Sequence, residues 1–123
     1  LGCLLGVMLA NIFFEHSVIE LSTKNRDGFH IFLAEIIATF GLIFIIFATL
    51  KDGKTTVAAC VATYISAGYW FTSSTSFANP AVAIARTFTD SFTGINYLNT
   101  PTYIIAELLG TIVAVLIVKR LLK

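Results

Sequence analysis

The chain contains 123 residues, of which 57% are hydrophobic and only 12% are charged, and its formal net charge is +1. Soluble domains carry roughly 25% charged residues. The low charge, together with a mean hydropathy of +0.88, indicates an integral membrane protein held in a lipid bilayer. Basic and aromatic residues are not interleaved outside the apolar segments, so a nucleic-acid-binding surface is excluded.

The first 30 residues divide into an apolar and a polar part. Residues 1–14 are too few to cross a bilayer, and we expect them to be the tail of a transmembrane helix. The chain opens with neither a Met start nor a charged signal region, so we expect an N-terminal part to precede it. Residues 15–30 have mixed charge and are predicted to form an outer loop. Cys3 and Cys60 lie in apolar sequence, where we expect buried small side chains instead of a metal site or a disulfide. No cofactor is expected.

Three later stretches have the length and apolar character of transmembrane helices, because a ~30 Å hydrocarbon core takes about 20 helical residues to cross. They are residues 31–50, 55–73 and 102–122. A short basic turn at 51–54 joins the first two. The second stretch is rich in small residues, which permit close helix packing, and it ends in aromatics typical of the membrane interface. An all-α membrane protein is therefore predicted.

Residues 74–100 interrupt this apolar sequence and are predicted to form a re-entrant loop with a half-helix at 80–90. Asn79 is a favoured N-cap residue, and Pro80 suits the first helical position. A helix of this length measures roughly 16 Å, about half of the hydrocarbon core. The polar run at 72–78 is expected to be extended and to descend roughly 20 Å to the midplane. Irregular backbone at that depth must be buried in protein or line water, so a cavity or pore is predicted.

Ionisable residues are costly within a membrane and must face protein or water. Glu35 and Glu107 lie in two of the predicted spans. We favour structural support, because a buried carboxylate can accept backbone N–H groups that a re-entrant loop leaves unpaired. Direct solute binding and proton relay are the alternatives. Arg86 and Asp90 stand four residues apart, and this spacing favours an ion pair in the outer vestibule over a pore gate at Arg86.

The Lys and Arg residues are distributed unevenly along the chain. Five lie in the 51–54 turn and the C-terminal tail, and two lie in the 15–30 connection. Cytoplasmic loops are enriched in these residues, so the turn and the C-terminus are predicted to face the cytoplasm. The re-entrant loop then enters from the outer side.

The tripeptide Asn79-Pro80-Ala81, entered from a helix of small residues and followed by a last span, resembles the signature box of the major intrinsic protein family, the aquaporins and glycerol facilitators. Ala34-Glu35 at the head of a span is similar to that family's Ala-Glu helix. The resemblance covers the whole chain. It implies an aquaporin-like bundle in which this chain is the second repeat, preceded by the tail of another helix, and it implies a homotetramer.

The residues around the tripeptide resemble one group within the family. Arg usually follows the second box of the family, whereas Val82 stands here, and Ser76 takes the place of Cys in mercury-sensitive members. The string from Ser76 to Val82, followed by Arg86 and Asp90, resembles prokaryotic aquaporin-like channels associated with arsenic resistance. Without the arginine, we expect a wider and less polar constriction. The residues expected to line the pore or bind solute are Ser76, Phe77, Ala78, Asn79, Pro80, Ala81 and Val82, with Ala67 and Gly68 on the preceding helix.

Together these features predict a passive channel for small uncharged solutes, such as glycerol, water or metalloid acids like arsenite, in a prokaryotic inner membrane. Its expected partners are neutral solutes, the lipid bilayer and a missing N-terminal half, without which this chain is not expected to conduct. An ordinary water or glycerol pore is one rival. A secondary transporter with a broken helix and an ion-coupling Glu35 is another. An enzyme is disfavoured, because His16 and His30 both lie in the outer connection, away from the loop.

Overall fold

The computed structural model describes residues 1–121, and every regular element in that range is a helix. The predicted all-α fold is thereby confirmed for the described part of the chain. Residue 122, the expected end of the last span, and Lys123 of the basic tail lie outside the described residues. The elements in chain order are α1 (Gly2–Phe13), α2 (Phe29–Thr49), the 3-10 turn η1 (Leu50–Asp52), α3 (Lys54–Phe71), α4 (Pro80–Ala85), the 3-10 turn η2 (Arg86–Phe88) and α5 (Thr100–Leu121).

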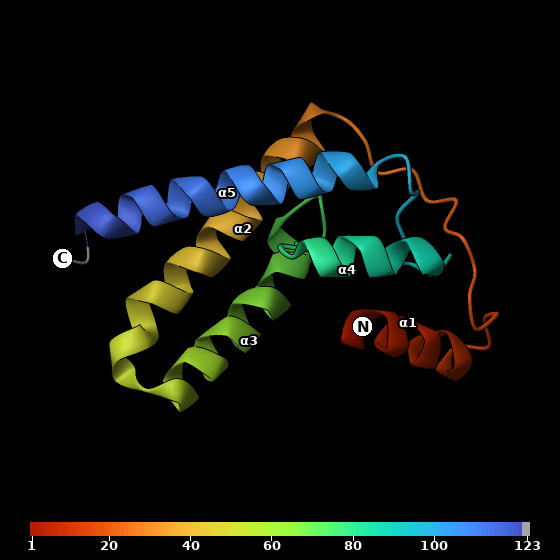
Figure 1. Cartoon of the computed structure of the whole chain (residues 1–123), viewed down its shortest axis with the longest axis horizontal. Helices are drawn as coiled ribbons and strands as arrows, with labels where there is room; N and C mark the ends of the chain where they lie inside the picture. Colours follow the sequence, from red (N-terminus) through yellow and green to blue (C-terminus); the bar gives the residue numbers. More distant parts are fainter. Residues whose placement is uncertain (122–123) are drawn as a thin grey trace.

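Two helices form the centre of the fold, and α5 crosses α2 in Figure 1. Among the described residues, two helices are long and apolar enough to cross a membrane. One is α2 together with η1, and the other is α5. Their contact depends on Gly110. A Cβ atom at this position would lie 2.5 Å from the carbonyl oxygen of Ile36 and 3.0 Å from the Cβ of Thr39. The small residue therefore sets how closely the two helices approach.

Helix α3 runs back alongside α2 as the second arm of a hairpin (Figure 1). The turn between them places Gly53 at φ +94°, a conformation that glycine adopts without a Cβ penalty. The Tyr64 hydroxyl donates to the carbonyl oxygen of Ala38 at 3.0 Å and so ties the two arms together. Expected to run from 55 to 73, the helix begins at Lys54 and ends at Phe71.

The outer loop lies along the exit of the half-helix. The backbone N–H groups of Glu20 and Ser22 donate to the carbonyl oxygens of Phe88 and Thr87, at 3.3 Å and 2.9 Å. Buried Asn11 joins α1 to the same segment, because its Nδ2 donates to the carbonyl oxygen of Phe88 at 3.0 Å. Helix α1 consequently packs beside α4 (Figure 1).

The half-helix is shorter than the sequence predicts. Its α-helical part ends at Ala85, the 3-10 turn η2 continues to Phe88, and Thr89 is extended, so the expected helix over 80–90 is wrong at its C-terminal end. The reason is tertiary: the carbonyl oxygens of Thr87 and Phe88 accept hydrogen bonds from the outer loop instead of from a further helical turn.

Residues 72–78, which precede the half-helix, fold back in turns. The expectation that this segment is extended is therefore wrong. Thr75, Ser76 and Ala78 all have positive φ values, of 62°, 49° and 49°. The N–H of Thr75 donates to the carbonyl oxygen of Thr72 at 3.3 Å, closing a turn. Left-handed residues reverse the chain direction locally, so this segment advances less per residue than a strand does.

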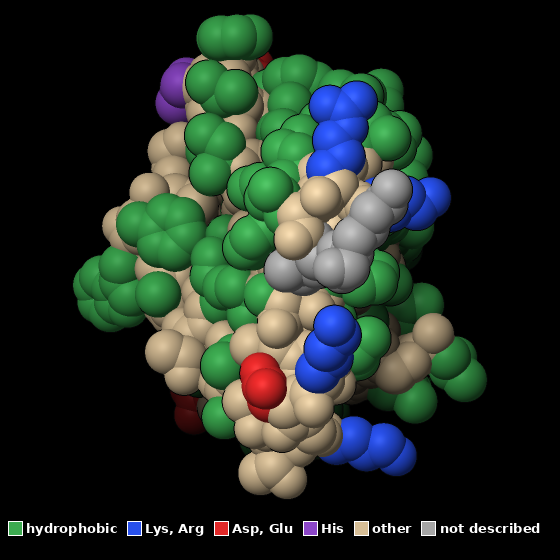
Figure 2. Space-filling model, turned by 90° about the vertical axis from the view of Figure 1, so that its left-hand side faces the viewer, with side chains coloured by type: hydrophobic (Ala, Val, Ile, Leu, Met, Phe, Trp, Pro, Cys, Tyr) green, Lys and Arg blue, Asp and Glu red, His purple; other side chains and the backbone are tan. Residues whose placement is uncertain are grey.

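The exterior of the fold is apolar while many of its buried groups are polar, the reverse of a soluble domain. Along α5, Leu109, Ile112 and Leu116 are all exposed. Figure 2 faces the end of the molecule that carries the C-terminus and the α2–α3 turn, and Lys and Arg side chains stand out there from a largely hydrophobic surface. The described basic residues of these two segments, all exposed, are Lys51, Lys54, Lys119 and Arg120.

Candidate pore loop

Asn79 caps the half-helix as its residue type predicts. Its backbone is extended, with φ −162° and ψ 116°, and its Oδ1 accepts the N–H of Ala81 at 2.9 Å. Pro80 occupies the first helical turn, where its missing N–H costs nothing. The cap uses only the oxygen of the Asn79 amide. The side chain is exposed on the described chain, and its NH2 group is a donor that this bond does not consume.

Two buried carboxylates hold the loop immediately before this cap. Glu35 of α2 accepts the N–H of Phe77 at 3.3 Å and also the N–H of Ala78. Glu107 of α5 accepts the N–H of Asn79 at 3.0 Å. The two glutamates are 0% and 1% exposed. Three consecutive N–H groups, which no helix or strand would satisfy here, therefore have acceptors supplied by the two central helices.

The side chains before Asn79 pack into the chain. Phe77 is buried, and its ring lies 4.8 Å from that of Tyr103, centroid to centroid. Ala78 is buried as well. The Tyr103 hydroxyl donates to the carbonyl oxygen of Ser74 at 3.2 Å and fixes the loop from the other side. Phe77 and Ala78 thus anchor the loop by packing, and their N–H groups by hydrogen bonding.

Ser76 meets helix α3 at Gly68. A Cβ atom at position 68 would lie 2.6 Å from the Ser76 Oγ, so a larger residue there would displace the loop. The structure thus brings together two residues that the sequence assigned to the pore. Ala67 lies elsewhere, in a shallow groove between α2 and α3 that it shares with Cys60 and Tyr64.

Val82 is half-buried and packs against the cluster that contains Phe77, Ala83 and Ile95. It stands one helical turn beyond Asn79, with Ala81 exposed between them. The spacing of Asn79 and Val82, three residues, places both on one side of the half-helix.

The predicted ion pair between Arg86 and Asp90 does not form, because the backbone leaves the helix between them and the i,i+4 geometry is lost. The Arg86 Nη2 donates to the Tyr69 hydroxyl at 2.7 Å instead. Asp90 accepts the backbone N–H of Thr23 at 2.7 Å and the hydroxyl of Thr23 at 3.0 Å. These bonds, with a smaller contribution from the Lys24 charge, hold the pKa of Asp90 below its ordinary value.

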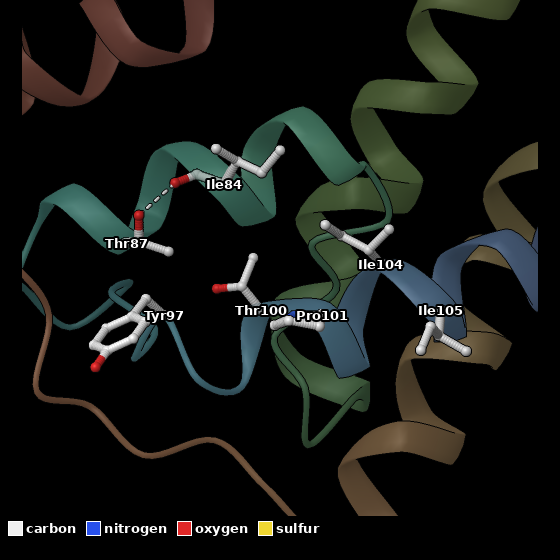
Figure 3. Close-up of a pocket in the computed structure, with 7 residues that line it drawn as sticks. All are labelled: Ile84, Thr87, Tyr97, Thr100, Pro101, Ile104 and Ile105. Atoms are coloured by element: carbon white, nitrogen blue, oxygen red, sulfur yellow. Dashed lines mark hydrogen bonds between the residues drawn. The ribbon is translucent and has the colours of Figure 1, made fainter.

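Figure 3 shows a shallow apolar groove between α4 and the start of α5, with a volume of about 370 Å³. The Thr87 hydroxyl in it already donates to the carbonyl oxygen of Ile84 at 2.7 Å, drawn as a dashed line. Neither Asn79 nor Arg86 lines this groove, so it lies on a different flank of the half-helix from the candidate solute-binding residues. The residues that line it are Ile84, Thr87, Tyr97, Thr100, Pro101, Ile104 and Ile105.

Sequence reasoning missed two residues that organise the outer end of the loop. Arg26 donates from Nε to the carbonyl oxygen of Gly94 at 2.8 Å and from Nη2 to that of Phe92 at 2.7 Å. The Tyr69 hydroxyl accepts a hydrogen bond from the Arg86 guanidinium. The partners are separated by 17 to 68 positions, so no local pattern indicates them.

Comparison with known proteins gives one informative match. The chain is 43% identical over 122 residues to "Aquaglyceroporin AqpS" from Rhizobium meliloti (strain 1021), a match that covers 99% of this chain and 52% of the relative. It therefore spans about half the length of the curated relative it matches. No family model matches the sequence, and no solved structure matches it. The similarity to the aquaglyceroporin extends along nearly the whole chain, which therefore corresponds to an aquaporin-like half.

Proposed function

We propose that this chain forms the C-terminal half of a membrane channel through which small uncharged solutes diffuse. The observation that carries the proposal is Asn79, whose capping oxygen is engaged while its amide NH2 is left as a donor at the start of a half-helix. A passing solute can replace its lost water contacts with this donor. The relative's name, an aquaglyceroporin, supports transport of neutral polyhydroxy molecules.

The expected cargo follows from Val82. An arginine at that position would place a fixed cation and several donors in the constriction, narrowing it and favouring water over larger neutral molecules. Valine leaves more room and fewer polar contacts. Glycerol, and metalloid acids such as undissociated arsenite, are therefore the solutes we propose, with water as a further permeant.

One half-helix reaches only about half of a ~30 Å hydrocarbon core, so the complete pore requires an opposing half. We propose that an N-terminal half of the same protein supplies it and that the assembled channel is a homotetramer. The basic end in Figure 2 supports a cytoplasmic C-terminus. On this orientation the loop enters from the outer face of a prokaryotic inner membrane.

The test is glycerol influx into vesicles that contain the complete protein. Asn79→Ala removes both the cap and the proposed donor, and we expect glycerol influx to fall at least roughly tenfold, the effect of losing a positioned hydrogen bond together with the loop geometry. Asn25→Ala is the matched control, because Asn25 is an exposed asparagine of the outer loop. Equal influx in the two variants would refute the role of Asn79.

The same vesicles separate a channel from a secondary transporter. Influx driven only by the glycerol gradient supports a channel, whereas dependence on a proton or sodium gradient would favour ion coupling at Glu35. Both oxygens of Glu35 accept N–H groups of the loop, which favours a supporting role for this carboxylate over one that binds and releases an ion.

A further inference from the structure

Arg86 lies on the same side of the half-helix as the candidate solute donor. Asn79, Val82 and Arg86 follow the i, i+3, i+7 spacing that keeps side chains on one helical face. The 3-10 turn that begins at Arg86 continues α4 directly, and the backbone of Arg86 is still right-handed, with φ −70° and ψ −7°. If Asn79 meets the solute at the midplane, Arg86 stands above it toward the outer mouth.

The Arg86 side chain is held in one place instead of extending freely into solvent. Its guanidinium carbon lies 4.2 Å from the centroid of the buried Phe77 ring. Its Nη2 donates to the hydroxyl of Tyr69, which is 39% exposed at the end of α3. Phe77 is only two residues before Asn79. The stacking therefore holds the guanidinium charge close to the loop residues that precede the half-helix.

No carboxylate forms an ion pair with Arg86 among residues 1–121, where the single ion pair is His16 with Glu20. Asp90, the expected partner, is bound to Thr23. The Nη1 of Arg86 is buried and has no hydrogen-bond partner in the described chain. A stacked guanidinium without an ion-pair partner exerts its field on whatever enters the adjacent space.

We propose that Arg86 supplies the fixed positive charge that excludes cations from the outer mouth of the pore, a task that position 82 cannot perform with a valine. This inference rests on the proposed channel function. The α4 dipole alone is a weak barrier, because the helix has only six residues and the carboxylate of Glu107 lies at its positive end. A charge at Arg86 lies beside the lumen and does not project into it. The constriction at position 82 can therefore stay wide while cations are still repelled.

The test measures sodium leak and glycerol influx in vesicles of the complete protein. Arg86→Gln keeps a donor for Tyr69 but loses the charge. We expect its sodium leak, relative to its glycerol influx, to rise at least roughly tenfold, as the Coulomb repulsion of unit charges several ångströms apart requires. Arg86→Lys retains the charge and is expected to retain exclusion. Lys24→Gln, which removes a cation from the same side of the protein, is the matched control and is expected to change nothing.

A rescue separates charge from structure. The double variant Arg86→Gln with Val82→Arg restores a cation near the constriction, and we expect it to restore sodium exclusion while reducing glycerol influx. Should Arg86→Gln fail to reach the membrane, Arg86→Met is measured in its place, with the same expected rise. An unchanged leak in a neutral variant that still conducts glycerol overturns the role of Arg86. Wild-type vesicles without glycerol influx would instead refute the channel function.

Discussion

Replacement of Glu35 tests whether the buried carboxylate supports the loop. Glu35→Leu leaves the N–H groups of Phe77 and Ala78 buried without an acceptor. At ~1–3 kcal/mol for each unsatisfied group, the loss in stability is about 2–6 kcal/mol. Glu35→Gln keeps one carbonyl oxygen, so one N–H retains its acceptor and the expected loss is roughly half as large. Glutamine should therefore be tolerated clearly better than leucine.

Thermal unfolding of the purified protein in detergent measures this ranking, and Glu107 provides an internal comparison. Glu107 accepts only the N–H of Asn79, so Glu107→Leu should cost about half as much as Glu35→Leu. Equal stability of the Gln and Leu variants at position 35 would refute structural support. If both were folded and neither conducted, Glu35 would be a transport carboxylate.

Four further outcomes are expected. Val82→Arg in the complete protein should reduce glycerol or arsenite influx far more than water influx; equal loss of all three would mean that the larger side chain only blocks the lumen. Vesicles containing residues 1–123 alone should show no saturable solute flux, and specific flux would contradict the need for a second half. Gly110→Ala should lower the melting temperature, because the added methyl group would press on the Ile36 carbonyl and reduce the free energy of unfolding by about 1–3 kcal/mol. Gly6→Ala is the control and should not lower it, because the space around Gly6 is open. Because the pKa of Asp90 is depressed in the folded protein, its bonds to the outer loop persist above its ordinary pKa of 3.8 and weaken as the pH falls below that value, so protease cleavage of the 15–28 loop should then increase. In Asp90→Ala, which lacks the acceptor, cleavage should be fast at neutral pH too.

The helical class and the start of the half-helix could be predicted from sequence because both depend on neighbouring residues. The apolar runs of α2 and α5 exceed the length needed to cross a bilayer. The cap at Asn79 requires only its own side chain and the N–H of Ala81, two residues away. A short-range signal of this kind is complete in the sequence itself.

The end of the half-helix and the partner of Arg86 were decided by tertiary structure. Helical propensity continues beyond Ala85, but the outer loop occupies the carbonyl oxygens that a further turn would need, and the chain becomes extended at Thr89. Arg86 is then no longer placed to pair with Asp90. It donates a hydrogen bond to Tyr69 at the end of α3 and stacks on Phe77 in the loop. Hydrogen bonds between distant segments compete with local ones of similar energy, so a sequence pattern indicates what a residue can do, and only the packed chain selects its partner.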